Sequence, residues 1–472
     1  MKKKKFIQNV LIMSSSMLII RIMGMASNIY ISAIAGSDAM GVYHLIFSVF
    51  TFGITFASSG TGFAVTRLVS EGRLNSRDII RKCLSISLAM SFVGFAIFFF
   101  GAEFINARFI RTAGSENAIR LLSVILPFMG ISSVIRGYFI AERRAFTLTL
   151  STVTEEAVGI VVTLFLLKNK LLPNYMCPIA GCAASTVFAV CPDVLMYIFY
   201  TIRETLKPKK CSYKDIFSIC VPIALGSYLR TGLVTVENLM IPLQFAKYGV
   251  SNPVGEYGII KAMAMPVMLF PTVFIQAFSS MLVPEMSEMN AKKYKNGIRY
   301  VSSLSLNTTT MFAFFIALML FKHHRIIAES FFEERGVSSY LKMISLLCIP
   351  MYMDTVADSI LKGLNLQNAS LRYNIIDSML RVTAIFVFMP RYGPHFYICM
   401  LYISEIFNLT LSLGKASRVT GLKIDFLSLI IKPAISACVA WWFSSPIAGT
   451  LVYMGMYKLC DKINLTISWG RS

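Results

Sequence analysis

The chain has 472 residues, 56% of them hydrophobic, with a mean hydropathy of +0.66. This composition excludes a water-soluble globular protein, because uncharged runs near the ~20 residues that cross a bilayer recur along the whole length. The formal net charge is +21, but the basic residues concentrate in alternate loops, as the positive-inside rule describes, so we expect no nucleic-acid partner. The ten cysteines form no C-x-x-C pair, and we expect no metal and no cofactor.

The first apolar run carries a cation in its interior. Arg21 lies within the segment Met13–Gly36, together with Ser27 and Asn28. A cation at that depth costs at least ~2.5 kcal/mol, so it should face water, a partner or a substrate rather than lipid. No acidic residue nearby in the sequence can neutralise Arg21. The first helix is therefore predicted to form one wall of a polar cavity.

The apolar runs predict an all-α polytopic membrane protein, because no segment alternates every second residue as a membrane barrel strand does. The predicted helices form two lobes of six helices each. The expected helices are Gln8–Ile34, Gly41–Val69, Ile79–Gly101, Ala118–Ala141, Thr147–Leu167, Tyr175–Ile202, Ile216–Ala246, Tyr257–Val283, Ile298–Phe321, Ser339–Leu361, Leu371–Met389 and His395–Ala416. Two weaker segments, Phe426–Phe443 and Ile447–Leu459, follow as helices thirteen and fourteen.

These helices divide the chain into four parts. We expect an N-terminal lobe over residues 1–202, a cytoplasmic linker over 203–215, a second lobe over 216–418 and C-terminal helices within 419–472. The bias of Lys and Arg places the N-terminus in the cytoplasm. The longest outer loop contains His323 and His324, which we interpret as a solvated pair because no acid–base constellation accompanies them.

The two lobes repeat several local patterns in the same order. Arg21 and Asn28 in the first helix correspond to Arg230 and Asn238 in the seventh, and Arg136-Gly137 in the fourth corresponds to Lys362-Gly363 in the tenth. The offsets are about 210–225 residues, the spacing of two six-helix lobes. Six helices return the chain to the same side, so the pattern predicts a parallel repeat about the membrane normal, of the type that rocks one lobe against the other.

These stretches resemble the multidrug/oligosaccharidyl-lipid/polysaccharide exporter superfamily, and within it the stage V sporulation protein B group of MATE-like oligosaccharide flippases. The segments GVYHLIFSVF, ASSGTGFAVTRLVSE and LPFMGISSVIRGYFIAERRAF carry the resemblance in the first lobe, and VPIALGSYLRTGLVTVENLMIPLQFAKYG carries it in the second. The resemblance implies a V-shaped fold and export of a lipid-linked saccharide, such as a peptidoglycan precursor for sporulation. It also implies a lipid-tail groove beside the two C-terminal helices.

A lipid-linked sugar carries phosphate charge, and cations could replace its lost hydration in the membrane. Arginine suits this role because its planar fork binds phosphate oxygens in pairs. We expect Arg21 and then Arg230 to bind the headgroup, with Arg67, Arg136 and Asn28 as further candidates. The alternatives are structural: Arg136 pairs with Glu155 or Glu156, Arg67 extends to the interface, and Glu237 neutralises Arg230.

Two carboxylates one helical turn apart, Asp354 and Asp358, are the leading candidates for ion coupling. Carboxylates paired in a membrane can carry a proton or hold sodium, and Glu155 and Glu237 are further candidates. The structural alternative is that Lys362 neutralises one of the pair. Arg381 is expected to pair with Asp377, one turn away. The driving force is thus a proton, a sodium ion or the membrane potential.

Three classes of function follow from these residues. The leading hypothesis is a multi-pass transporter of the bacterial cell membrane that moves a lipid-linked saccharide from the inner to the outer leaflet, with membrane lipids as its other partners. A cation-coupled multidrug exporter is the alternative transporter, and a non-transporting scaffold for cell-wall synthesis is the alternative of another class. We expect no enzyme, because no catalytic acid, base or nucleophile stands in a recognisable constellation.

Overall fold

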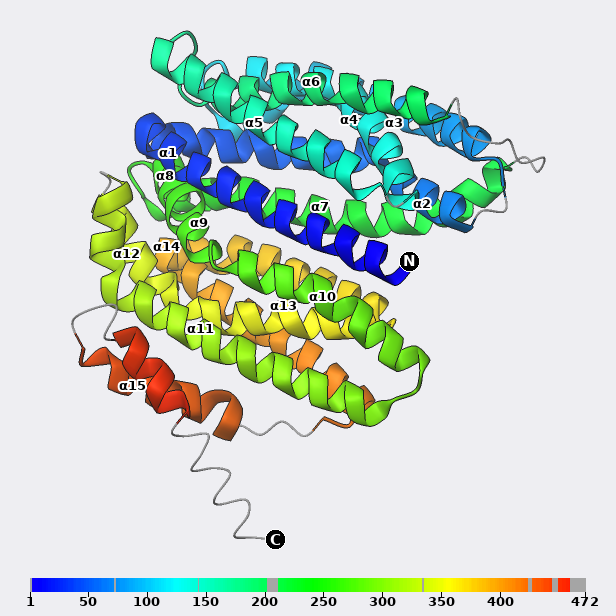
Figure 1. The fold of residues 1–472 in the computed structure, drawn as a ribbon. Coiled ribbons are helices and arrows are strands. Elements are labelled where there is room, and N and C mark those ends of the chain that lie inside the picture. The colour runs from blue at the N-terminus through cyan, green and yellow to red at the C-terminus, as the bar shows by residue number, and fades with distance from the viewer. Residues whose placement is uncertain are drawn as a thin grey trace. The chain divides into compact units, whose positions relative to one another are not determined.

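The structure is a computed structural model that describes residues 2–71, 74–142, 144–201, 211–332, 335–422, 427–443 and 449–458 (Figure 1). Side chains are described in these ranges except for residues 2–18, 21, 145–146, 200–201, 335 and 427–428. Every regular element in the described part is a helix, and nine helices there are long and apolar enough to span a membrane, or ten if one bent pair counts as a span. The predicted all-α polytopic fold is confirmed.

Contacts between residues divide the chain into two compact units, Met1–Ala262 and Met263–Ser472. The first unit therefore contains the predicted first lobe together with the next two helical segments. The predicted linker at residues 203–215 lies mostly outside the described residues, and the lobe boundaries drawn from the sequence repeat stay a prediction.

Helices of the first unit follow the predicted spans closely. They are α1 (Lys2–Ser58), α2 (Thr61–Glu71), α3 (Ser76–Ile105), the π-helix η1 (Asn106–Ile110), α4 (Ser115–Ala141), α5 (Ala145–Asn169), α6 (Met176–Thr201), α7 (Tyr213–Tyr248), α8 (Pro253–Gly258) and the π-helix η2 (Ile259–Ala264). Gly36, with φ 82° and ψ 166°, separates α1 into two arms. This break falls in the predicted gap between the first two helices, where a residue without a Cβ adopts positive φ at little cost.

The second predicted helix, Gly41–Val69, is wrong as a continuous element. Ser59 and Gly60 take left-handed conformations, with φ of 44° and 70°, and they end α1 before α2 begins. Ser59 Oγ bonds the Phe56 carbonyl and lies 2.6 Å from the Tyr228 hydroxyl of α7. A serine hydroxyl that bonds a nearby backbone carbonyl competes with the hydrogen bonds of the helix. The periodicity of apolar residues does not reveal this competition.

The second unit begins at Met263 and contains a break in its longest helix. Its elements are α9 (Met265–Leu269), α10 (Thr272–Ala291), α11 (Lys295–Phe331), α12 (Arg335–Ile344), the 3₁₀ turn η3 (Ser345–Leu347), α13 (Cys348–Gly363), α14 (Gln367–Thr420), the π-helix η4 (Leu427–Ile431) and α15 (Lys432–Trp441), with a further helical stretch at 449–458. Gly393, at φ 66° and ψ −154°, divides α14 into two arms at the predicted gap between the eleventh and twelfth helices.

Three details of the second half differ from the predicted spans. The predicted helix Tyr257–Val283 contains the π-helix η2 and bends by 56° beside Pro271, which cannot donate a backbone hydrogen bond. Helix α11 continues to Phe331, so His323 and His324 lie on a helix that kinks at His323 and not in a loop. The apolar part of the thirteenth segment, Leu429–Trp441, is shorter than a full span.

A buried apolar cluster joins α2, α3 and α4 to the start of α7. Its members are fully or almost fully buried and include Ala64, Ile79, Cys83, Val134 and Phe139. Small residues on α2 allow this packing: a Cβ on Gly62 would lie 2.8 Å from the carbonyl oxygen of a residue on α4. The cluster fixes the frame on which α4, α5 and α6 present their polar side chains.

An ion pair on α3 holds the start of α7. Asp78 Oδ2 accepts the Cys211 backbone N–H at 2.7 Å, and Lys82 Nζ donates to the Cys211 carbonyl at 2.5 Å while pairing with Asp78 at 3.2 Å. Burial raises the pKa of the Cys211 thiol, so it stays protonated at neutral pH. Both backbone groups of Cys211 are therefore satisfied next to the Ser212 cap that begins α7.

The part of α1 that follows the Gly36 break and helix α8 approach each other so closely that no side chain fits between their backbones. A Cβ on Gly258 would overlap the Ser37 carbonyl, and one on Gly41 would overlap the Val254 carbonyl. Beside them Asn252 Nδ2 donates to Asp38 Oδ1 at 2.5 Å. Small residues at this joint let the backbones meet directly, as in membrane helix pairs generally.

Replacing Gly258 by alanine should therefore destabilise the protein. The added methyl must displace backbone atoms, which costs about 1–3 kcal/mol in a packed interior, so the midpoint of thermal unfolding in detergent should fall. Gly226→Ala is the matched control, because nothing lies within 4 Å of a Cβ at that position of α7. Equal midpoints for the two variants would contradict the close approach.

Candidate functional site

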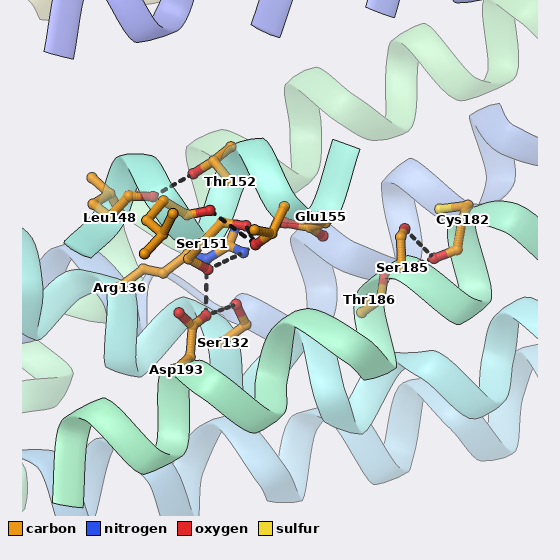
Figure 2. Close-up of polar contacts among 12 residues, drawn as sticks. Ser132, Arg136, Leu148, Ser151, Thr152, Glu155, Cys182, Ser185, Thr186 and Asp193 are labelled. Carbon is orange, nitrogen blue, oxygen red and sulfur yellow. Dashed lines mark hydrogen bonds and ion pairs between the residues drawn. The ribbon is translucent and has the colours of Figure 1, made fainter. Parts of the chain in front are cut away.

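A buried ion network joins α4, α5 and α6 through Arg136 (Figure 2). Its guanidinium donates from Nη2 to Glu155 Oε2 at 2.6 Å and from Nε to Asp193 Oδ2 at 3.2 Å. The Ser151 hydroxyl accepts a further bond from Nη2 at 3.2 Å, and the Ser132 hydroxyl donates to Asp193 at 3.3 Å. Ser132 and Arg136 are one turn apart on α4, as are Ser151 and Glu155 on α5, so helical periodicity brings them to facing surfaces.

This network neutralises Arg136 within the protein. The Asp193 side chain is fully buried, and those of Glu155 and Arg136 are 20% and 24% exposed. A buried guanidinium held by two carboxylates is a structural element, which fits the predicted structural alternative with Glu155 as the partner. The bond to Asp193 was not predicted, because Asp193 follows Arg136 by more than fifty residues and only the packing of α6 against α4 brings them together.

Next to this network the first unit contains a polar cavity of about 300 Å³. Helix α1 contributes Ser27, Asn28 and Tyr43, whereas α5 contributes Glu155 and Glu156. The remaining lining residues are Gly24, Ile31, Met40, Phe47, Gly159, Ile160, Thr163, Pro178, Cys182 and Ser185. The cavity is thus walled by α1, α5 and α6, and the sequence prediction that the first helix lines a polar cavity is consistent with it.

The two neighbouring glutamates have different surroundings. Glu155 is bound by Arg136, whereas no hydrogen bond or ion pair connects Glu156 to another described residue. Glu156 approaches α1 where that helix has no side chain, since its Oε1 lies 2.7 Å from the position of a Cβ on Gly24. Asn28 faces the same cavity and accepts a hydrogen bond from Ser32 at 3.1 Å. Among the described side chains, the cavity therefore offers one unpaired carboxylate and several neutral polar groups.

The predicted headgroup arginines occupy different settings. The Arg21 side chain lies outside the described residues, although its position on α1 is three residues before Gly24. Arg67 is largely exposed and pairs with Glu71 at 3.2 Å. Arg230 is exposed on α7, and no ion pair joins it to a described residue. Glu237, its expected partner two turns later, is 2% exposed.

The second unit holds a second buried polar cluster, on α13 and both arms of α14. Asp377 pairs with Arg381 at 3.2 Å, as their one-turn spacing predicts, and accepts a bond from Ser404 at 2.7 Å. Asp358 accepts bonds from Ser370 at 2.8 Å and Ser412 at 3.4 Å. Lys362 is exposed and forms no ion pair with Asp358 in the described part of the chain. Two serines donate to that carboxylate instead, so the predicted neutralisation of Asp358 by Lys362 is wrong.

Asp354 lies in the same cluster, one turn before Asp358. Its Oδ1 atom is buried and has no hydrogen-bond partner among the described residues. Electrostatic interactions link Asp354 to Asp358, Asp377 and Glu405. The described part of this cluster therefore contains four carboxylates and one guanidinium, that of Arg381. Such an excess of acid in a membrane is suited to holding a proton or a small cation.

The two clusters lie on helices that correspond to each other in the repeat predicted from the sequence. In the first unit Ser132 of the fourth predicted helix donates to Asp193 of the sixth. In the second unit Ser412 of the twelfth donates to Asp358 of the tenth. The same pair of helices is joined in each half, with the hydroxyl and the carboxylate exchanged.

An apolar cavity of about 440 Å³ lies where α15 meets α11. It is lined almost entirely by hydrocarbon and aromatic groups, among them Phe314, Phe321, Ile349, Trp441 and Trp442. Lys322 Nζ bonds the carbonyls of Trp441 and Phe443 and fixes the end of α15 beside it. This is the place at which the resemblance implied a lipid-tail groove.

The fold defines a helical multi-pass membrane protein, and the described residues of each unit include a buried ionic cluster. The chain belongs to the family described as "Polysaccharide biosynthesis protein", whose pattern matches residues 6–290. The predicted resemblance to the multidrug/oligosaccharidyl-lipid/polysaccharide exporter superfamily is thereby confirmed.

The relatives have low sequence identity to the chain but align with most of its length. The chain is 20% identical to Stage V sporulation protein B of Bacillus subtilis (strain 168) over 409 residues, covering 83% of this chain and 79% of that protein. It is 22% identical to Lipid II flippase MurJ of the same organism over 428 residues, covering 80% and 76%.

Solved structures share the fold. An inward closed structure of Lipid II flippase MurJ matches with a TM-score of 0.74 and 13% identity, over 96% of this chain and 98% of that one. An inward-facing multidrug resistance MATE family transporter of the MOP superfamily matches with a TM-score of 0.67 and 13% identity, over 87% and 98%. At these identities the likeness establishes the fold and not the substrate.

Removing the Arg136 guanidinium should destabilise the protein strongly. Arg136→Met leaves Asp193 buried and unpaired, and breaking a buried ion pair in this way costs about 3–5 kcal/mol. Equilibrium unfolding in detergent measures the change. Arg67→Met is the control, because exposed pairs contribute about 0–1 kcal/mol. If the two variants lose the same stability, the Arg136 network is not the structural element described.

Proposed function

We propose that this protein is a transporter that moves a lipid-linked saccharide from the inner to the outer leaflet of a bacterial cell membrane. Membership of a polysaccharide biosynthesis family supports a saccharide substrate, and the names of the relatives include a lipid II flippase and a sporulation protein. The proposal places the N-terminus in the cytoplasm and the substrate among precursors of the cell wall or spore cortex, and it assigns no enzymatic step.

The observation that carries the proposal is the polar cavity on α1. A diphosphate headgroup cannot cross ~30 Å of hydrocarbon without groups that replace its hydration. The cavity supplies hydroxyl, amide and carboxylate groups at Ser27, Asn28 and Glu156 inside an apolar bundle. Arg21 is on the same helix, two turns before Asn28, and in the proposal it binds the phosphates that adjoin the sugar.

The substrate's lipid tail remains in hydrocarbon while the headgroup crosses. The apolar cavity between α11 and α15 is a suitable surface for part of that tail, because its lining is hydrocarbon and aromatic. Burial of each CH₂ group there contributes about 0.8 kcal/mol.

The acidic cluster of the second unit supports ion coupling. Asp354 and Asp358 are adjacent on α13, and Asp354 Oδ1 is buried without a hydrogen-bond partner among the described residues. Uptake of a proton or sodium ion there would change the charge of α13 and α14 and so favour one conformation over another. The membrane potential is the third driving force consistent with a charged substrate.

A second candidate function is a cation-coupled multidrug exporter of the MATE type. The unpaired Glu156 carboxylate favours it, because an organic cation seeks an acidic wall, and MATE transporters share the fold. The exposed Arg230 and the position of Arg21 favour an anionic headgroup instead. Competition between a lipid-linked saccharide and an organic cation in reconstituted vesicles distinguishes the two, and a non-transporting scaffold would move neither.

Arg21→Ala should abolish complementation of a flippase-deficient strain while the protein still inserts into the membrane. The variant removes the cation that pairs with the phosphates, and charge-assisted bonds of this kind contribute about 1.5–3 kcal/mol each. Growth of the strain and the membrane-bound amount of protein are both measured. Arg120→Ala, which removes a cation paired with exposed Glu103, should complement normally. Full activity of Arg21→Ala would exclude Arg21 from the mechanism.

Asp354→Asn should uncouple transport from its ion gradient. Asparagine keeps the side-chain volume but can neither take up a proton nor supply a negative charge to sodium. Flipping in proteoliposomes should then become insensitive to imposed proton and sodium gradients, whereas Glu288→Gln, at an exposed pair with Lys292, should respond as the native protein does. An unchanged gradient response in Asp354→Asn would show that coupling resides elsewhere.

A further inference from the structure

We propose that the α1–α5–α6 cavity binds a hydroxyl- and amine-bearing residue of the transported headgroup, with the Glu156 carboxylate accepting its ammonium group. This inference rests on the proposed function and adds to it the chemistry of the group that the cavity recognises. Its source is an aminosugar or an amino-acid residue attached to the sugar, since both present an ammonium beside neutral polar groups.

The charge balance of the cavity points to a cationic group. Glu155 and Asp193 both accept hydrogen bonds from the Arg136 guanidinium, so each of these charged groups has a partner within the protein. Glu156 faces the same cavity with no hydrogen bond or ion pair to any described residue. A carboxylate only accepts hydrogen bonds, and one removed from bulk water is stabilised most by a charged donor.

The size of the cavity favours an organic group over a bare metal ion. A hard cation such as Ca²⁺ is held by six to eight oxygen atoms at about 2.3–2.6 Å from several directions. The cavity is about 300 Å³, at the lower end of the range for small organic ligands. The part of the chain that the structure describes has no group of three or more His, Cys, Asp or Glu side chains placed to hold a metal. One ring or one amino-acid residue suits the space.

Neutral groups around the carboxylate match a polyhydroxylated ligand. Ser27 and Asn28 on α1, Thr163 on α5 and Ser185 on α6 all line the cavity. They supply both donors and acceptors from three helices, which would hold the hydroxyl and amide groups of a sugar or peptide unit. Hydrocarbon and aromatic walls from Ile31, Met40 and Phe47 complete the lining.

Gly24 positions the carboxylate. Because Glu156 Oε1 lies 2.7 Å from where a Gly24 Cβ would be, any larger residue on α1 forces the carboxylate away. Glycine in a membrane helix commonly allows such close approach. Gly24 lies one turn after Arg21, so a phosphate bound by Arg21 and an ammonium bound by Glu156 would belong to adjacent parts of one headgroup.

The test measures binding of simple probes to the full-length protein in nanodiscs by isothermal titration calorimetry at neutral pH. The probes are glucosamine, alanyl-lysine and N-acetylglucosamine, the last having its amine capped. We expect an amine-bearing probe to bind at least roughly tenfold more tightly than N-acetylglucosamine. Preference for glucosamine identifies an aminosugar, and preference for alanyl-lysine identifies an amino-acid residue.

Two variants test separately the charge of Glu156 and the position of its carboxylate. Glu156→Gln should remove the preference for the amine, and Gly24→Ala should weaken it while leaving every charge in place. Glu103→Gln, at a carboxylate whose side chain is 75% exposed, should bind like the native protein. Thermal unfolding of each variant shows whether it is folded. Equal binding of glucosamine and N-acetylglucosamine, an unchanged preference in Glu156→Gln, or no binding of any probe to the native protein would overturn the proposal.

A parallel flipping assay with a fluorescent lipid-linked saccharide keeps this inference separate from the proposed function. Flipping without amine selectivity would reject the role of Glu156 and leave the transport proposal standing. Amine selectivity without flipping would retain the cavity's ligand and reject transport of the lipid-linked saccharide.

Discussion

Hydrocarbon neither hydrates charges nor bonds to backbone groups, and this constraint governs both the fold and the placement of its ionic residues. Every backbone group in a span must be satisfied within its helix, and every buried charge needs a partner or a polar cavity. Arg136 meets the requirement by binding Glu155 and Asp193 at once, and Arg381 does so with Asp377. Arg136 holds three helices together, whereas Arg381 pairs within α14. Among the described acids, Glu156 lines the cavity of the first unit without an ion pair, and Asp354 Oδ1 is buried without a hydrogen-bond partner.

The sequence was informative about most features that a single helix determines. Apolar run length located the spans, and glycine marked the breaks at Gly36 and Gly393. One-turn spacing predicted the pair of Arg381 with Asp377. Periodicity did not predict the break at Ser59, because it depends on a hydroxyl that bonds the local backbone, nor the contact of Arg136 with Asp193, because it depends on how distant helices pack.

The candidate site shows the same division between local and long-range information. Asn28 and Glu155 were predicted as functional residues, and both line the cavity of the first unit. The sequence suggested Glu156 only as a possible structural partner for Arg136. In the structure Glu155 is that partner. Two adjacent glutamates on a helix point about 100° apart, so one faces α4 and the other α1, and the sequence alone does not assign which.

We propose that the protein carries a saccharide headgroup through a polar cavity between apolar helices. The most direct measurement reconstitutes the purified protein in liposomes with a fluorescent lipid-linked saccharide and adds a membrane-impermeant quencher outside. We expect the fraction of headgroup fluorescence that is protected in the inner leaflet to fall with time as the substrate crosses. Protection that stays equal to that of protein-free liposomes would contradict it.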